Sequence, residues 1–205
     1  MWPRTATLTA LSLLLVLPAQ ARTLDVSDDP SRGSDDAPLV LVEFSDLQCG
    51  ACQGFVHKTL PTLQKEYVDT GKLRLVWVDN PLDVHLKAFD AAVGAECAAR
   101  QDAFWGYHDA IYTYMNAERD ALVVYADGLD LDLAAFEACL DDKEAKKAVR
   151  HDVRMARSMR LNSTPSFALA KPREDGKLEV LEVIRGGAPP LPGFKARIER
   201  HLGGE

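Results

Sequence analysis

Two cysteines separated by two residues, Cys49 and Cys52, lie in the stretch DLQCGACQGF at residues 46–55. Such a pair can form half of a zinc site, close a structural bridge, or carry electrons by switching between dithiol and disulfide. A zinc site needs a second cysteine pair or two histidines at regular spacing. The other two cysteines are isolated and the five histidines are scattered. We therefore favour thiol–disulfide chemistry and expect neither a metal nor a cofactor.

The position of the pair gives the two thiols different chemistry. Cys49 follows an apolar run and begins a stretch with helical spacing, so unpaired backbone N–H groups and the helix dipole stabilise its thiolate. Such positions lower a cysteine pKa from ~8.5 toward ~3.5–7. Cys52, one turn further along, would be the more buried, resolving thiol. Gly50 and Ala51 between them are small and uncharged.

The elements around the pair predict a βαβ unit. The run LVLVEF at 39–44 is continuous and branched, as expected of a central strand covered on both faces. Residues 50–71 show helical spacing, with Pro61 expected to kink or restart the helix. LRLVWVD at 73–79 reads as a second buried strand. Strand, long helix and strand imply parallel strands joined by a right-handed crossover.

The rest of the chain reads as a helical block followed by ββα. The helical pattern runs over about residues 84–161. It has breaks near Gln101, Asn116 and Gly128. The segments at 163–170 and 178–186 are expected to form an antiparallel hairpin, and PLPGFKARIERHL closes the chain as an amphipathic helix.

Residues 1–21 read as a secretory signal peptide. Arg4 supplies a positive charge, residues 6–17 are apolar, and Ala21 ends a small-residue cleavage site. An apolar run of about twelve residues is too short to span a bilayer comfortably, which argues against an uncleaved anchor. A buried helix is the other alternative. We expect an exported protein cut after Ala21, followed by a polar, flexible lead-in at 22–37.

The charge and the expected export limit the possible partners. A formal net charge of −7 argues against nucleic acid and is typical of a solvated surface. Disulfides form and persist outside the cytosol, so an even number of cysteines is first a redox question.

These features together resemble a known family. The βαβ, helical block and ββα order, with Cys-x-x-Cys at the first strand–helix junction, resembles the thioredoxin fold of DsbA-type thiol–disulfide oxidoreductases. DDAPLVLVEFSDLQCGACQGF at 35–55 is similar to the DsbA-like branch with a compact helical insertion. FWGYHDAIY at 104–112 and DLAAFEACL at 132–140 look like parts of that insertion. The resemblance covers about residues 35–202.

The resemblance implies an α/β fold class. It implies a thioredoxin-fold domain formed by residues 38–81 and 162–205, with an inserted all-helical subdomain at 82–161. It also assigns roles to three residues. Glu43 stands where these proteins place a buried acid that accepts or relays the proton of the resolving cysteine. A strand-end glutamate facing solvent is the alternative. Thr164 and Pro165 stand where the family has a cis-proline loop, whose backbone pairs with an extended substrate beside the cysteines.

Two departures from the strongly oxidising members leave the direction of the reaction open. Those members carry a proline and a histidine between the cysteines and a valine before the cis-proline, whereas this chain has Gly50, Ala51 and Thr164. A threonine is more typical of the isomerase branch, and its hydroxyl can hydrogen-bond a cysteine sulfur. Isomerase relatives add an N-terminal dimerisation domain, for which residues 22–37 are too short, so a monomer is expected.

The remaining cysteines and two histidines have simpler interpretations. Cys97 and Cys139 each share a helical face with apolar residues, so they are either buried free thiols or a second, structural disulfide. An oxidising compartment favours the disulfide. His57 is expected at the helix surface, and His85 on a loop near the site without a role in the chemistry.

The sequence therefore predicts an extracytoplasmic, periplasmic or secreted, thiol–disulfide oxidoreductase. It would donate its Cys49–Cys52 disulfide to folding exported proteins that contain cysteines, and a membrane redox partner would reoxidise it. A reductase or isomerase of the same fold is one alternative. A non-catalytic chaperone, or a metal-binding module using the cysteine pair, is the alternative from another class of protein.

Overall fold

The computed structural model describes residues 22–203. The predicted signal peptide, residues 1–21, lies outside this range. Within residues 22–203, none of the helices has both the length and the apolar character that crossing a membrane requires.

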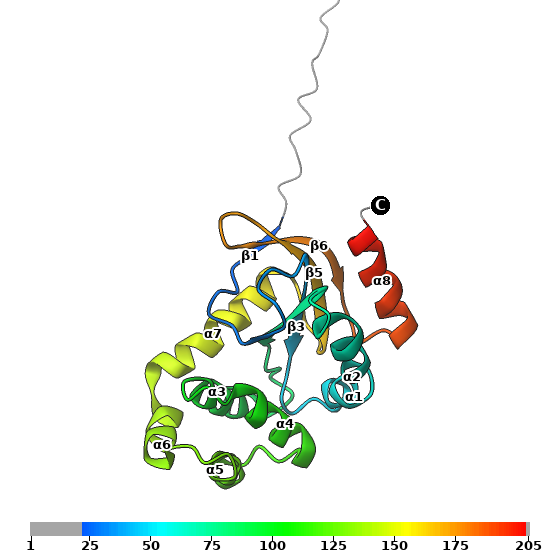
Figure 1. The fold of residues 1–205 in the computed structure, drawn as a ribbon. Helices are drawn as coiled ribbons and strands as arrows, with labels where there is room; N and C mark the ends of the chain where they lie inside the picture. The colour runs from blue at the N-terminus through cyan, green and yellow to red at the C-terminus, as the bar shows by residue number, and fades with distance from the viewer. Residues whose placement is uncertain (1–21, 204–205) are drawn as a thin grey trace, which may run out of the picture.

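A six-stranded mixed sheet forms the centre of the structure (Figure 1), in the order β1-β6-β5-β3-β4-β2. The strands are β1 (Thr23–Leu24), β2 (Ser31–Arg32), β3 (Leu39–Ser45), β4 (Leu73–Asp79), β5 (Ser166–Pro172) and β6 (Leu178–Ile184). Every residue of β3 is buried, as its continuous apolar run predicts. It pairs in parallel with β4 and antiparallel with β5, which forms a hairpin with β6.

Helices cover both faces of this sheet. On one face, Leu39 and Leu41 of β3 belong to the larger core, which includes residues of α1 (Gly50–Lys58) and α8 (Leu191–Gly203). On the other face, Val40 and Val42 pack in a smaller core with α7 (Lys143–Ser158). Successive side chains of β3 point to opposite faces of the sheet, so this strand contributes to both cores.

Pro61 interrupts the helix that follows the cysteines, as the sequence predicts. Helix α1 ends at Lys58, and the chain continues as α2 (Leu60–Leu63) and a π-helical turn, η1 (Gln64–Val68). Proline has no backbone N–H to donate. It is tolerated at the start of α2 because the first N–H groups of a helix have no partner within the helix.

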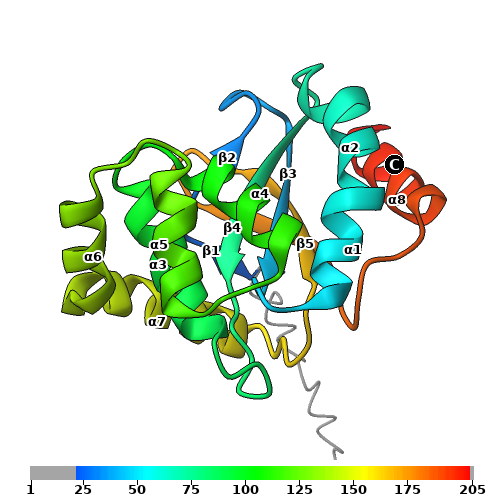
Figure 2. The ribbon, with the colours of Figure 1, turned by 90° about the horizontal axis from the view of Figure 1, so that it is seen from below.

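The helical block lies between β4 and β5. Its helices are α3 (Ala88–Ala99), α4 (Phe104–Tyr114), α5 (Arg119–Asp127), α6 (Leu133–Asp141) and α7. The expected breaks near Gln101, Asn116 and Gly128 fall between successive helices. A fourth break, at Asp142, was not predicted from the sequence. The Asp142 carboxylate caps α7 by accepting from the Glu144 N–H at 3.1 Å. Seen from below, α3, α5, α6 and α7 gather on the left, and α1, α2 and α8 on the right (Figure 2).

The structure corrects the expectation of a flexible lead-in at residues 22–37. Within this segment β1 pairs with β6 and β2 with β4, so each outer strand of the sheet comes from it. Leu24 and Val26 are buried, and the Pro30 carbonyl accepts from the Trp77 N–H at 2.9 Å. Backbone pairing at a sheet edge needs few apolar side chains, so the polar composition hid it.

Candidate active site

The loop between β3 and α1 holds Cys49 at the beginning of the helix. The Cys49 N–H donates to the Asp46 carbonyl at 2.9 Å, and the Gln48 N–H donates to Asp46 Oδ1 at 2.8 Å. Cys49 is the N-cap residue with an extended backbone, and no acidic residue lies in the first turn of α1. Both thiols of the pair are free and buried, with Cys49 6% and Cys52 0% exposed.

The structure separates the acidities of the two thiols. A hydrogen bond with the Cys52 side chain lowers the pKa of Cys49 to about 5 despite its burial, and the backbone N–H groups of Cys52 and Ala51 contribute. Burial raises the pKa of Cys52 far above its ordinary value, and the contact with Cys49 and the charge of Glu43 raise it further. Cys49 is therefore the thiolate at neutral pH, and Cys52 is the thiol.

Thr164 and Pro165 lie against Cys49, and the peptide bond between them is cis. The Cys49 thiol lies 3.4 Å from the Thr164 carbonyl oxygen. The Thr164 hydroxyl also lowers the pKa of Cys49. It has no hydrogen-bond partner of normal geometry among residues 22–203, whereas the carbonyl oxygen lies within hydrogen-bonding distance of the sulfur. The Pro165 carbonyl accepts from the Gly187 N–H at 3.0 Å, which ties this loop to the segment before α8.

Glu43 is a buried acid, 1% exposed, rather than a strand-end residue facing solvent. Burial raises its pKa to about 8, against a hydrogen bond with Ser45 that lowers it, and nearby Cys49 raises it further. Its Oε1 has no hydrogen-bond partner in the part of the chain that the structure describes. The Glu43 carboxyl is thus protonated at neutral pH and electrostatically coupled to Cys52.

The second pair of cysteines lies in the helical block. Cys97 of α3 and Cys139 of α6 form a disulfide with an S–S distance of 2.03 Å. The bridge joins residues 42 positions apart and links two helices that pack against each other.

The structure also brings Tyr112 and His85 to the loop at residues 46–49 that ends with Cys49, here called the redox loop. Neither residue was given a role from the sequence. The Tyr112 hydroxyl donates to the Asp46 carbonyl at 3.1 Å, and the Tyr112 backbone carbonyl accepts from Gln53 Nε2 at 2.7 Å. His57 Nε2 also lies 3.2 Å from this carbonyl. His85 Nδ1 is 2.7 Å from Asp46 Oδ2. Asp46, next to the cysteine motif and typical of a turn, is the signal that could have pointed to both.

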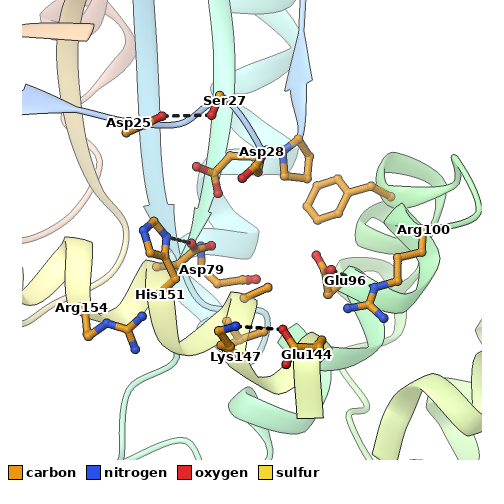
Figure 3. Close-up of a pocket in the computed structure, with 16 residues that line it drawn as sticks. Asp25, Ser27, Asp28, Asp79, Glu96, Arg100, Glu144, Lys147, His151 and Arg154 are labelled. Carbon is orange, nitrogen blue, oxygen red and sulfur yellow. Dashed lines mark hydrogen bonds and ion pairs between the residues drawn. The ribbon is translucent and has the colours of Figure 1, made fainter. Parts of the chain in front are cut away.

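A separate pocket, lined by several carboxylates, lies between the N-terminal segment, β4, α3 and α7 (Figure 3). Its acidic lining residues are Asp25, Asp28, Asp29, Asp79, Glu96, Glu144 and Asp152. No cysteine lines it, and residues 22–203 contain no group of three or more His, Cys, Asp or Glu side chains arranged to hold a metal ion.

Burial makes several of these acids weak. Burial, the charge of Asp152 and a hydrogen bond with it raise the pKa of Asp29 to about 9. Burial and the charge of Asp152 raise the pKa of Asp79 well above its ordinary value. Burial raises the pKa of Asp152 to about 6. The Asp79 N–H donates to Asp152 Oδ2 at 3.1 Å, so the cluster ties β4 to α7.

Comparisons with known proteins agree with the fold. The thioredoxin family matches residues 25–180. A Bacillus anthracis protein named "Probable disulfide bond formation protein D" is 32% identical over 149 residues, covering 68% of this chain and 69% of that protein. The Na(+)/H(+) antiporter NhaA 3 of Salinispora tropica is 35% identical over 159 residues, which cover 77% of this chain. The chain spans about a quarter of the antiporter's length, since the match covers 24% of it.

Solved structures resemble the whole described domain. Wolbachia pipientis alpha-DsbA1 has a TM-score of 0.72 at 23% identity, over 92% of this chain and 94% of that one. Oxidised BdbD from Bacillus subtilis has a TM-score of 0.74 at 21% identity, over 90% and 98%. These likenesses confirm the predicted thioredoxin fold with a helical insertion.

Proposed function

The chain belongs to the thioredoxin family and resembles its DsbA-like members, and from this premise we propose that it is an extracytoplasmic thiol–disulfide oxidoreductase. It donates a Cys49–Cys52 disulfide to exported proteins as they fold. The observation that carries the proposal is the opposite shift of the two thiols, with the pKa of Cys49 at about 5 and that of Cys52 raised. A structural bridge needs no such difference.

The reaction begins with the oxidised form. A substrate thiolate attacks the Cys49 sulfur, the bond between Cys49 and Cys52 breaks, and Cys52 leaves with the electron pair. Since the pKa of Cys52 is raised, the departing thiolate takes up a proton. Glu43 is protonated below pH about 8 and coupled to Cys52, so its carboxyl supplies that proton directly or through water.

A second substrate thiolate completes the exchange. It attacks the substrate sulfur of the mixed disulfide, and Cys49 leaves as the thiolate. A thiol of low pKa is a good leaving group, so the acidity of Cys49 favours release. The substrate gains a disulfide and the protein is left as a dithiol, which balances the two electrons transferred.

The same acidity supports oxidation over reduction as the physiological direction. Stabilising the Cys49 thiolate stabilises the reduced form, and a stable reduced form makes the disulfide a stronger oxidant. The missing proline and histidine between the cysteines do not prevent this, because the backbone N–H groups of the helix start and the Cys52 thiol provide the stabilisation.

The Thr164 and Pro165 backbone offers substrate a place to align. The Thr164 carbonyl lies 3.4 Å from the Cys49 sulfur, so an extended segment pairing with this backbone brings its own cysteine to that sulfur.

Three features support an extracytoplasmic location and a reoxidising partner. The leader at 1–21 fits export, the Cys97–Cys139 disulfide fits an oxidising compartment, and the Bacillus anthracis relative is named for disulfide bond formation. A membrane redox partner that accepts two electrons from the dithiol would restore the disulfide. We also propose that the protein acts as a monomer, and its net charge of −7 argues against binding nucleic acid.

The equilibrium potential of the Cys49–Cys52 pair, measured against glutathione, tests the proposed direction. We expect a potential well above that of thioredoxin, about −270 mV, and oxidation of a reduced, unfolded model protein. A thioredoxin-like potential would favour the reductase alternative. Thiol titration with and without a chelator tests the metal-binding alternative, because bound zinc would block both thiols.

A further inference from the structure

Helix α7 is basic in a chain that is acidic as a whole. It contains six lysines and arginines against two acids, a net charge of +4, whereas the whole chain has a net charge of −7. Its apolar residues, among them Val149 and Ala156, are buried in the fold. Arg150, Arg154 and Arg157 are exposed and, at spacings of four and three residues, share one face of the helix.

These three arginines have no ion-pair partner. Among residues 22–203, no carboxylate lies within ion-pair distance of Arg150, Arg154 or Arg157. Lys147, one turn before Arg150, does pair with Glu144 at 3.0 Å. The chain has 31 acids and 24 lysines and arginines, so its composition does not explain three neighbouring arginines without a partner. Their guanidinium groups keep paired N–H donors, which suit the oxygens of a phosphate group.

A groove lies between this face of α7 and the segment at residues 80–87, and we call it the basic groove. Its lining includes the three arginines, Leu86 and Phe89. Asp83 is the one acid among the described residues that line it. The guanidinium carbon of Arg150 lies 5.3 Å from the centre of the Phe89 ring, so the ring helps to hold this charge at the groove.

Two apolar side chains project into solvent at the rim of the basic groove. Leu86, which lines it, is 88% exposed, and Val84 is 75% exposed. Val84 lines a neighbouring hollow together with Val153 and Arg157. A surface that binds anionic membranes combines these two features, because its basic side chains contact lipid phosphates while its apolar side chains enter the boundary between headgroups and acyl chains.

We propose that the basic groove, with Val84 and Leu86 at its rim, binds the surface of a membrane that contains anionic phospholipid. This inference goes beyond the proposed function, which assigns no lipid site. Asp46 Oδ2 accepts from the Leu82 N–H at 2.8 Å and lies 2.7 Å from His85 Nδ1, and both residues line the groove. A membrane bound there would lie beside the redox loop.

Two observations favour a lipid surface over a dissolved anion. Arg150 and Arg157 are seven residues apart, ~10 Å along the helix, which suits several lipid headgroups better than one phosphate ion. Val84 and Leu86 stand out into solvent, where they give a small hydrophilic anion nothing to contact but can enter a membrane surface.

The acidity of the rest of the chain does not prevent this binding. Exposed charges more than ~8 Å apart are largely screened at physiological ionic strength. Arg154 also borders the carboxylate pocket (Figure 3). Burial raises the pKa of Asp29 to about 9 and that of Asp79 well above its ordinary value, so neither acid is charged at neutral pH. The pocket is therefore less negative than its composition suggests.

Sedimentation with lipid vesicles tests the inference. The protein purified after export is mixed with vesicles of phosphatidylcholine alone or of phosphatidylcholine with phosphatidylglycerol. We expect binding only to the vesicles with phosphatidylglycerol, and weaker binding as the salt concentration rises. Arg150→Gln, Arg154→Gln and Arg157→Gln together should weaken this binding about 100-fold, at about fivefold for each charge removed. Leu86→Ser should weaken it by up to about tenfold.

A second triple variant is the matched control. Lys171→Gln, Arg173→Gln and Lys177→Gln remove the same charge from three exposed residues of the β5–β6 hairpin, and this protein should retain most of its binding. Both triple variants should keep the Tm of the unmodified protein, because the altered side chains are exposed. The assay contains no thiol substrate, so its outcome does not depend on whether the protein carries out thiol exchange.

Four results would overturn the inference. The first is no binding to vesicles with phosphatidylglycerol. The second is equal weakening by the two triple variants, which would mean that total charge rather than the basic groove decides binding. The third is displacement by inorganic phosphate at constant ionic strength, which would indicate a site for a small anion. The fourth is preferential binding of a polyglutamate peptide, which would assign the groove to an acidic protein segment.

Discussion

The redox loop and the carboxylate pocket lie near the same end of the sheet, since Ser45 of β3 is paired with Asp79 of β4. Burial raises the pKa of acidic groups in both regions, but only the redox loop also holds a group whose pKa is lowered. At the redox loop, hydrogen bonds stabilise the charged form of Cys49. In the pocket, burial favours the neutral form of Asp29 and Asp79.

The difference shows that a shifted pKa does not identify a reactive site by itself. Cys49 combines its shift with a partner thiol and with a peptide backbone 3.4 Å from its sulfur. Asp29, Asp79 and Asp152 are joined to one another and to the backbone of the fold. We therefore expect the first region to control the chemistry and the second to control stability.

The largest expected effect comes from Cys49→Ser. It removes the attacked sulfur and should reduce oxidation of protein thiols on the order of a thousandfold or more. Cys52→Ser cannot form the Cys49–Cys52 disulfide and should also lose oxidation, but mixed disulfides that Cys49 forms with substrate disulfides should accumulate, because no neighbouring thiol displaces them. Non-reducing electrophoresis and mass spectrometry would distinguish the two variants. Mixed disulfides at Cys52 in the Cys49→Ser protein would reverse the assignment.

Glu43→Gln should change the pH dependence of the reaction. In the unmodified protein, proton donation to Cys52 should weaken as the pH rises through about 8, where Glu43 ionises. The glutamine cannot donate in this way, so the reaction at pH 7 should slow by about 10- to 100-fold and the step near pH 8 should disappear. Stopped-flow measurement of Cys49–Cys52 opening would show it. An unchanged pH profile would remove Glu43 from the mechanism.

Asp29→Asn should affect stability rather than chemistry. The folded state raises the pKa of Asp29 from 3.8 to about 9, so the folded protein binds this proton more tightly than the unfolded chain does. The contribution of Asp29 to the free energy of unfolding is fully present below pH 3.8 and is lost as the pH rises through about 9. At pH 8 the variant should have a Tm higher by about 3 °C, with a flatter dependence on pH.

Asp28→Asn is the control for this prediction, because it makes the same substitution at the exposed neighbouring residue. It should change Tm less than Asp29→Asn. Thermal unfolding between pH 4 and 9 would compare the two, with the thiolate titration of Cys49 followed in parallel. A change in that titration in Asp29→Asn would show that the two regions are coupled.

Thr164→Val should give the smallest effect. The Thr164 hydroxyl lowers the pKa of Cys49, whereas the carbonyl contact comes from the backbone and survives the change. The pKa of Cys49 should therefore rise by a few tenths, and the pair should become slightly less oxidising. A fall in the Cys49 pKa would mean that the hydroxyl opposes the thiolate.

The fold followed from patterns that burial imposes on the sequence. The apolar run of β3, the helical spacing after Cys49 and the restart at Pro61 each reflect local rules of packing or proline geometry. The pairing of β1 with β6 and of β2 with β4 was not predicted, because it depends on backbone hydrogen bonds at the edges of the sheet. The break at Asp142 was missed because α6 and α7 follow each other almost without a loop.

The reactive cysteines were easier to predict than the residues that position them. The Cys49 and Cys52 spacing is a local signal, and Thr164 and Pro165 entered through a resemblance to known proteins. The contacts of Asp46 with Tyr112 and His85 join segments far apart in the sequence, so the turn residue Asp46 could signal a contact but no local pattern could identify its partners. Thr164 also contacts the Cys49 sulfur through its backbone carbonyl, which a residue type does not predict.

The titration of the Cys49 thiolate tests the central claim most directly. Thiolate absorbance of the reduced protein would be followed against pH, with the Cys49→Ser protein as the blank. Our account predicts a midpoint at about pH 5, with Cys52 remaining a thiol through neutral pH. A midpoint at or above the free-cysteine value of ~8.5 would contradict it, because Cys49 would then be no better a leaving group than an ordinary thiol.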